Sequence, residues 1–156
     1  MCTVIEEKDV SLVTLSLALE QAVIRHDLDE EEQKIYITET AWFPFWIHVR
    51  RGPGLVVLNT NTKFRSHVNT VQRLELANEF NGTYSLISAC VDDAHLLVDY
   101  ALLYRDGLTR ESFIRACRIF SDNVSRAISE LDPDDTLLLE PGESEVNEEE
   151  QAQDKQ

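Results

Sequence analysis

The stretch that decides the fold is residues 76–131, LANEFNGTYSLISACVDDAHLLVDYALLYRDGLTRESFIRACRIFSDNVSRAISEL. It begins with the end of a helix, and two apolar runs follow, over residues 84–91 and 95–104. The short acidic turn Asp92-Asp93-Ala94 separates these runs, so we predict two strands that pair antiparallel. After the breaker Asp106-Gly107, a long helix is predicted up to Leu131.

The apolar side chains of this last helix recur in steps of three and four residues. Thr109 is placed to cap its first turn. The predicted buried face consists of Phe113, Cys117, Phe120, Val124, Ala127 or Ile128, and Leu131. A face of this length predicts a helix that packs along a sheet.

The N-terminal part predicts another helix, over residues 9–26, capped by Asp9 or Ser11. Its apolar face would contain Leu12, Leu15, Leu19, Ala22 and Val23. Residues 27–32, DLDEEE, then place five carboxylates in six positions. They lack the glycine that an EF-hand loop needs for its turn, so a solvated connector is favoured over a calcium site.

Three further strands are predicted over residues 34–40, 41–51 and 55–62, with Gly52-Pro53-Gly54 between the last two. Pro44 has no amide hydrogen, which places the start of the second strand at an edge, a bend or a bulge. Leu55-Val56-Val57-Leu58 is apolar on both faces and suits a central strand.

A middle helix should follow these strands. Asn69 can cap it and Gln72 can reach back to the cap, while Gly82 would end it in a left-handed conformation. Its predicted buried stripe is Val71, Leu74, Ala77 and Phe80.

The resulting order, α-β-β-β-α-β-β-α, predicts an α+β fold with an antiparallel sheet. We expect a single domain over residues 1–131 and an acidic, disordered tail over residues 132–156. Within that tail, only the run Leu137-Leu138-Leu139 offers enough apolar surface to dock locally.

The charge of the chain disfavours nucleic acid as a partner. The net charge is −15, and ten acidic residues but only one lysine lie in residues 132–156. The remaining 131 residues still carry 19 acidic and 13 basic side chains, without a basic stripe that could release counterions from a phosphate backbone.

The three cysteines, Cys2, Cys90 and Cys117, have no metal-ligand spacing and do not suggest a disulfide framework. Cys90 and Cys117 fall in apolar segments, where we expect them in the core. The N-terminus does not resemble a secretory signal, and no apolar run approaches the roughly 20 residues of a membrane span. These features predict a soluble protein of the reducing cytoplasm, with no membrane partner.

Several local motifs resemble those of the YbjN-type family of bacterial sensory transduction regulators, over about half of the chain. They are Asn78, Phe80 and Asn81 at the end of the middle helix, the hairpin around Asp92-Asp93, and Asp106-Gly107 before the last helix. The hairpin turn lacks the glycine of the family pattern, and the acidic tail is additional. The resemblance implies a fold similar to that of the small dimeric type III secretion chaperones and a non-enzymatic regulatory or binding role. From the residues themselves, a structural role is favoured for Asn78 and Asn81 over contact with a ligand.

The sequence contains no nucleophile elbow, phosphate-binding glycine loop or paired histidine motif. The best catalytic arrangement would combine His48, His67 and His95 with Cys90 or Asp99, if the fold brought them together. Solvated or hydrogen-bonded histidines are favoured. We therefore predict no catalytic residue, no cofactor and no metal ion.

Trp42, Phe43, Phe45 and Trp46 surround Pro44 in a single strand-like run. Alternation along a strand directs neighbouring rings to opposite faces, so they cannot all enter one core unless the chain bends at Pro44. The surplus rings would either pack under a helix or the tail, or form a protein interface. We adopt these four residues as a candidate partner-binding site.

Together these features predict a protein-binding regulator or chaperone-like adaptor, acting as a homodimer on an unidentified protein partner. The alternative is a small-ligand sensor or enzyme that uses a pocket between the sheet and the last helix.

Overall fold

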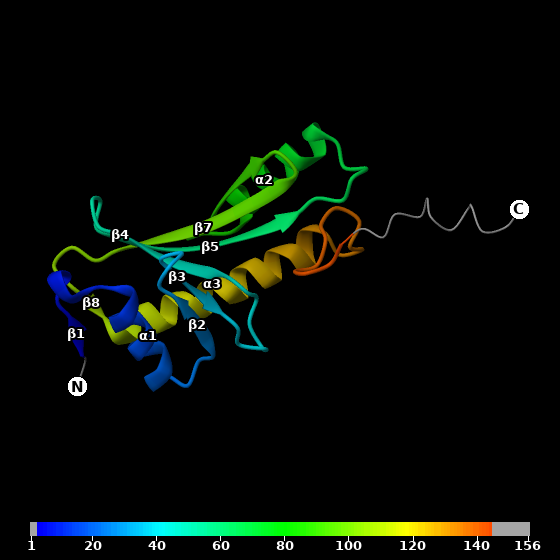
Figure 1. The fold of residues 1–156 in the computed structure, drawn as a ribbon. Coiled ribbons are helices and arrows are strands. Elements are labelled where there is room, and N and C mark those ends of the chain that lie inside the picture. Colours follow the sequence, from blue (N-terminus) through cyan, green and yellow to red (C-terminus); the bar gives the residue numbers. More distant parts are fainter. Residues whose placement is uncertain (1–2, 145–156) are drawn as a thin grey trace, which may run out of the picture.

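The computed structural model describes residues 3–144 of the chain. They form an α+β fold in which three α-helices pack on a six-stranded antiparallel sheet (Figure 1). The strand order is β2-β3-β4-β5-β7-β6. These strands are β2 His26–Asp29, β3 Lys34–Ile37, β4 Trp46–Arg50, β5 Leu55–Lys63, β6 Ser88–Asp92 and β7 His95–Leu103. A second small sheet pairs β1, Val4–Ile5, with β8, Leu108–Thr109. The predicted fold class and element order are confirmed, and β1, β2 and β8 are additional strands.

Long pairing between β5 and β7 forms the centre of the sheet. Their register runs from Leu55 opposite Leu103 to Lys63 opposite His95. The hairpin from β6 to β7 is also as predicted, because Asp92 pairs with His95 across Asp93-Ala94. Asp93 takes the left-handed conformation, with a φ of 49°, that such a tight turn requires where the family pattern has glycine.

The last helix, α3 (Arg110–Leu131), packs along the sheet with the predicted face. The Thr109 side chain accepts a hydrogen bond from the Ser112 amide, at 3.1 Å, and so caps the helix. Five of the predicted side chains are at most 1% exposed: Phe113, Cys117, Phe120, Val124 and Ala127. The ring of Phe120 lies edge-on to Phe45, with 5.1 Å between centroids. The space between the sheet and α3 is therefore filled by aromatic and aliphatic side chains.

The middle helix, α2 (Thr70–Thr83), begins with the predicted capping box. Asn69 and Gln72 exchange hydrogen bonds between side chain and backbone, both of 3.0 Å. The predicted stripe is partly wrong, because Val71 and Leu74 are 62% and 50% exposed. The buried residues are Leu76, Ala77 and Phe80, and the helix continues past Gly82 to Thr83 without a left-handed residue.

The first helix, α1 (Leu12–Gln21), is shorter than predicted. Ser11 forms its capping box with Thr14, and a short 3₁₀ helix, Glu7–Asp9, precedes it. Val23 does not belong to the buried face, since it follows the helix with a φ of 59° and is 86% exposed.

The prediction of a solvated connector over residues 27–32 is also wrong for its first half. Asp27 and Asp29 belong to β2, which pairs antiparallel with β3 at the edge of the sheet. An edge strand leaves one side in water, so it tolerates carboxylates that a central strand would not.

The predicted strand over residues 41–51 is correct only for Trp46–Arg50, because residues 41–45 form an irregular segment around Pro44. Likewise, only residues 88–91 of the run 84–91 are paired, in a strand that continues to Asp92.

The chain after α3 packs against the body, which contradicts the expectation of disorder from Asp132 onward. Leu138 and Leu139 are each 3% exposed, and the Leu139 amide donates to the Lys63 carbonyl at 2.9 Å. Asp132 is itself buried and accepts hydrogen bonds from the amides of Thr136, Leu137 and Leu138, at 2.8–3.1 Å. The docking expected for the three leucines is therefore observed, while residues 145–156 of the predicted tail lie outside the described residues.

Candidate functional site: the helix-free face of the sheet

The sheet has one face without a helix, which we call the open face. Alternation along the strands places one set of side chains there. Its members include Tyr36, Trp46, His48, Leu55, Val57, Asn59, Leu97, Asp99 and Leu103. None of them belongs to the hydrophobic core cluster, which lies between the helices and the other face of the sheet. The open face is therefore the large surface of the sheet that the described part of the chain leaves uncovered.

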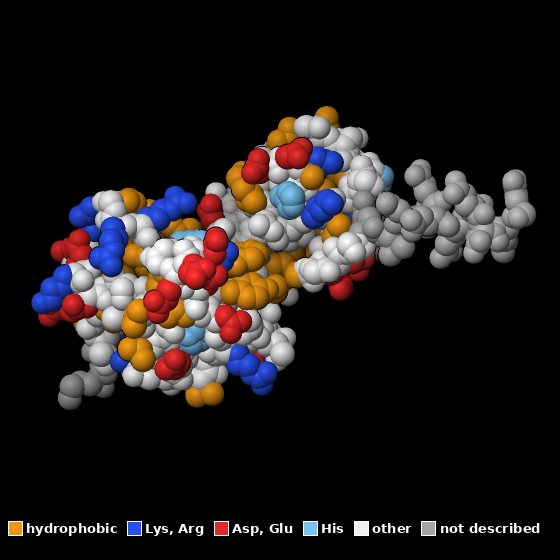
Figure 2. All heavy atoms as spheres, viewed as in Figure 1, with side chains coloured by type: hydrophobic (Ala, Val, Ile, Leu, Met, Phe, Trp, Pro, Cys, Tyr) orange, Lys and Arg blue, Asp and Glu red, His pale blue; other side chains and the backbone are white. Residues whose placement is uncertain are grey.

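Apolar side chains lie on this face among the polar residues of its central strands. Tyr36 and Trp46 lie opposite each other on β3 and β4, with ring centroids 5.2 Å apart and planes tilted by 33°. Val57 is 6% exposed although no helix covers it, because its neighbours in the sheet shield it. Leu103 at the end of β7 is 66% exposed. In the view of Figure 2, hydrophobic side chains also gather in the middle of the molecule, where α3 and β5 lie in Figure 1, with acidic side chains on one side of them.

A groove of about 460 Å³ crosses the open face over β4, β5 and β7. It is lined by His48, Asn59, Asp99 and Leu97, with Glu32 and Arg50 among the charged residues. Burial lowers the pKa of His48 below its usual value, which favours the neutral imidazole. The buried side-chain oxygen of Asn59 lies beside His48, whose imidazole is placed to donate to it. The groove thus combines polar and charged side chains with a few apolar ones.

The four aromatic residues of the candidate site do not form one surface. Phe45 is completely buried in the core, so it cannot contact a partner. Trp42 stacks on Phe45, with 6.4 Å between centroids, and Phe43 lies against α3, where its amide donates to the Ser121 hydroxyl. Only Trp46 lies on the open face. The bend at Pro44 therefore sends three of the rings toward α3, as expected for packing under a helix, and one to the opposite face.

The family-motif residues act at the junction of α2 and β6. The Asn81 amide group donates to the Ala89 carbonyl at 2.8 Å and accepts from the Ala89 amide at 2.7 Å. Phe80 is completely buried, and Asn78 is exposed. The structural interpretation therefore holds for Asn81, whose side chain pairs with the edge of β6 in the way that a neighbouring strand would.

The candidate catalytic residues do not converge. His48 and Asp99 share the groove, but His67 is exposed in the loop before α2 and His95 begins β7. Cys90 is exposed on β6, contrary to the expectation of a core position. Cys117 is buried, and burial raises the pKa of its thiol, so the reactive thiolate is disfavoured. Within residues 3–144, no group of three or more acidic, histidine or cysteine side chains could hold a metal ion.

One polar pair was not predicted from the sequence. The Ser16 hydroxyl lies 2.7 Å from Nε2 of His26, whose Nδ1 lies 2.8 Å from the Ile24 carbonyl. A donated Nδ1–H leaves Nε2 as the acceptor for Ser16, which is the arrangement of an activated serine. However, Ser16 is only 7% exposed on the core side of α1. The pair is therefore best explained as structural, satisfying two polar groups between α1 and β2.

In the part of the chain that the structure describes, no helix is both long and apolar enough to cross a bilayer.

Comparison with known proteins gives the family. The YbjN family, described as "Putative bacterial sensory transduction regulator", matches residues 11–133. Curated proteins show no match to this sequence. Among solved structures, the chain is similar to YbjN from E. coli, described as "a putative transcription regulator", with a TM-score of 0.71 and 18% sequence identity. That similarity covers 85% of this chain and 97% of the E. coli chain. Because the family match spans most of the sequence, this chain belongs to the YbjN family.

Proposed function

We propose that this protein is a non-enzymatic regulator that binds other proteins and forms a homodimer through the open face of its sheet. The observation that carries the proposal is the apolar surface that no helix covers, made by Tyr36, Trp46, Leu97 and Leu103. Aromatic and aliphatic side chains of this kind are enriched at interface centres, where their burial contributes most of the binding energy.

The surrounding charges favour self-association with a polar rim. Asp99 and Arg50 both line the groove, and other charged residues lie further out on the sheet: Asp27 and Asp29 on β2, Lys34 on β3 and Lys63 on β5. In a two-fold dimer, the same patch of both copies forms the interface. Because this face carries acidic and basic side chains, acidic residues of one copy can face basic residues of the other. We also propose that the protein is located in the reducing cytoplasm. The thiols of Cys90 and Cys117, which form no disulfide, support this location.

An enzyme or sensor with its site between the sheet and the last helix has less support. That space holds Phe45, Phe113 and Phe120, each at most 1% exposed. Similarity to the E. coli protein supports the fold, whereas its description as a transcription regulator comes to this chain only as a proposal. We propose that any such regulation acts through protein contact rather than through DNA.

The oligomeric state tests the proposal. Light scattering on the purified protein should give a mass near twice the 17.9 kDa of one chain. Replacing Trp46 and Leu97 together by Ala should shift the mass toward one chain, because both changes remove apolar area from the centre of the open face.

A matched control replaces Val71 and Leu74 by Ala, since these two apolar side chains are exposed on α2, outside the open face. It should leave the mass unchanged. A wild-type protein that is monomeric at high concentration would refute the homodimer, and equal masses for both double variants would exclude the open face as its interface.

A further inference from the structure

A second candidate site lies on the helical side of the molecule, between the end of α1 and the start of α3. Here a pocket of about 370 Å³ is lined by Gln21, Ala22, Arg110, Glu111, Ile114, Arg115 and Arg118. Its volume is within the usual range of small-molecule sites. The site involves none of the open-face residues, so it is independent of the proposed dimer.

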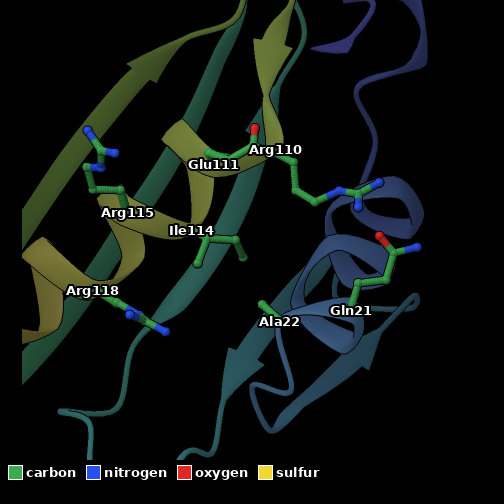
Figure 3. A pocket seen from close by; sticks show the side chains of 7 residues that line it. All are labelled: Gln21, Ala22, Arg110, Glu111, Ile114, Arg115 and Arg118. Atoms are coloured by element: carbon green, nitrogen blue, oxygen red, sulfur yellow. The ribbon is translucent and has the colours of Figure 1, made fainter. Parts of the chain in front are cut away.

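The geometry of α3 creates an arginine stripe with an apolar centre. Arg110, Ile114 and Arg118 follow one another at steps of four residues and therefore share one side of the helix. Figure 3 shows the side chains of Arg110 and Arg118 extending toward α1, on either side of Ile114, with Ala22 across the gap. Arg115 points away from α1 in the same view. The pocket thus combines two guanidinium groups with a floor of Ile114 and Ala22.

Among the described residues these arginines have no acidic partner, although the chain contains 29 acidic and only 14 basic residues. Among the described residues, ion pairs do form at Arg65, Arg105 and Arg126. The side chains of Arg110, Arg115 and Arg118 form neither an ion pair nor a hydrogen bond with the described part of the chain. The Nε–H of Arg110 is also buried without an acceptor.

A buried donor without an acceptor costs free energy, and a guanidinium group that gains an anionic partner recovers it. The positive end of the α3 dipole lies in the same place, because Arg110 is the first residue of the helix. Glu111 contributes one opposing carboxylate to the lining. The local field therefore favours an anion, although the whole chain carries a net charge of −15.

We propose that this pocket binds a small organic anion, in which a phosphate, sulfonate or carboxylate group contacts Arg110 and Arg118 and an apolar part contacts Ile114 and Ala22. Recognition then needs both parts of the ligand: the charge selects the guanidinium groups, and the apolar part displaces water from the floor between them.

The fluorescent probe 8-anilinonaphthalene-1-sulfonate tests this proposal, since it joins a sulfonate to an apolar ring system. It should bind to one saturable site, and the uncharged N-phenyl-1-naphthylamine should bind far more weakly. Arg110→Gln and Arg118→Gln should each weaken sulfonate-probe binding at least about fivefold, the loss expected for one charge-assisted contact. Arg126→Gln, at the other end of α3, removes the same charge and should leave the affinity within about twofold.

Arg118 is exposed, so its variant should fold even where Arg110→Gln does not. Displacement of the probe by phenyl phosphate or by benzoate would support the proposal and would identify the preferred anionic group. Unchanged binding in Arg118→Gln, equal affinity for the neutral probe, or no saturable binding would overturn it. Displacement only by an acidic peptide would also overturn it, in favour of a protein ligand. The arginine variants should have the same oligomeric mass as the wild-type protein, so that a change in probe binding is not caused by a change in dimerisation.

Discussion

At the scale of single residues, the packing of Phe120 fixes how α3 lies on the sheet. Its ring is 1% exposed and meets Phe45 edge-on, so truncation would leave a cavity that rigid neighbours on both elements cannot fill. We predict that Phe120→Ala lowers the free energy of unfolding by about 3 kcal/mol, measured by urea denaturation. The exposed Asp122 on the same helix provides the control, since Asp122→Ala should cost less than about 0.5 kcal/mol. Equal losses would mean that this face of α3 is not the buried one.

For the four aromatic residues around Pro44, the sequence predicts only part of the arrangement of their side chains. Alternation correctly predicts that Trp42, Phe43, Phe45 and Trp46 cannot share one face, but it cannot predict which ring enters the core. That outcome depends on the irregular backbone around Pro44 and on the distant Ser121, whose hydroxyl binds the Phe43 amide at 2.8 Å. Contacts between residues so far apart in sequence leave no local pattern.

At the scale of elements, periodicity explains why one helix was predicted well and another was not. The apolar positions of α3 alternate between steps of four and three residues, which average close to the 3.6 residues of a helical turn. The predicted stripe of α2 takes three successive steps of three, from Val71 through Leu74 and Ala77 to Phe80. Each such step falls about 60° short of a full turn, so Val71 lies on the side opposite Phe80. The capping boxes were predictable because they depend only on neighbouring residues.

The edge strand β2 and the docked segment after α3 were missed for a related reason. Both are rich in acidic residues, and composition alone favours solvated chain. In each case backbone pairing decides the structure: β2 pairs with β3, and Phe64 forms a bridge with Leu138. The open face could not be predicted either, because it depends on which side of the sheet all three helices occupy.

Asp132 provides the test for the docked segment, because its buried carboxylate organises the turn that returns residues 137–139 to the sheet. We predict that Asp132→Ala lowers the free energy of unfolding by about 2 kcal/mol, since three backbone amides lose their acceptor and the amide of Leu138 is buried. Hydrogen exchange at the amides of Leu137 and Leu139 should accelerate in this variant. The exposed Asp134 gives a matched carboxylate control, and Asp134→Ala should change neither quantity. Slow exchange that survives Asp132→Ala would show that the leucines dock without this carboxylate.

At the scale of the whole molecule, the charge distribution separates regulation through protein contact from regulation through DNA. The net charge is −15, and Arg110 and Arg118 gather in one pocket rather than along a surface that could follow a duplex. We predict that a labelled DNA duplex shows no change in fluorescence anisotropy with about 10 μM protein at about 0.15 M salt, conditions in which nonspecific DNA-binding proteins begin to bind. Binding that weakens steeply with added salt would contradict this prediction, because it would require several phosphate contacts. Repeating the measurement with Arg118→Gln would then identify whether the arginine pocket supplies one of those contacts, as the loss of one contact lowers the salt dependence by about one unit.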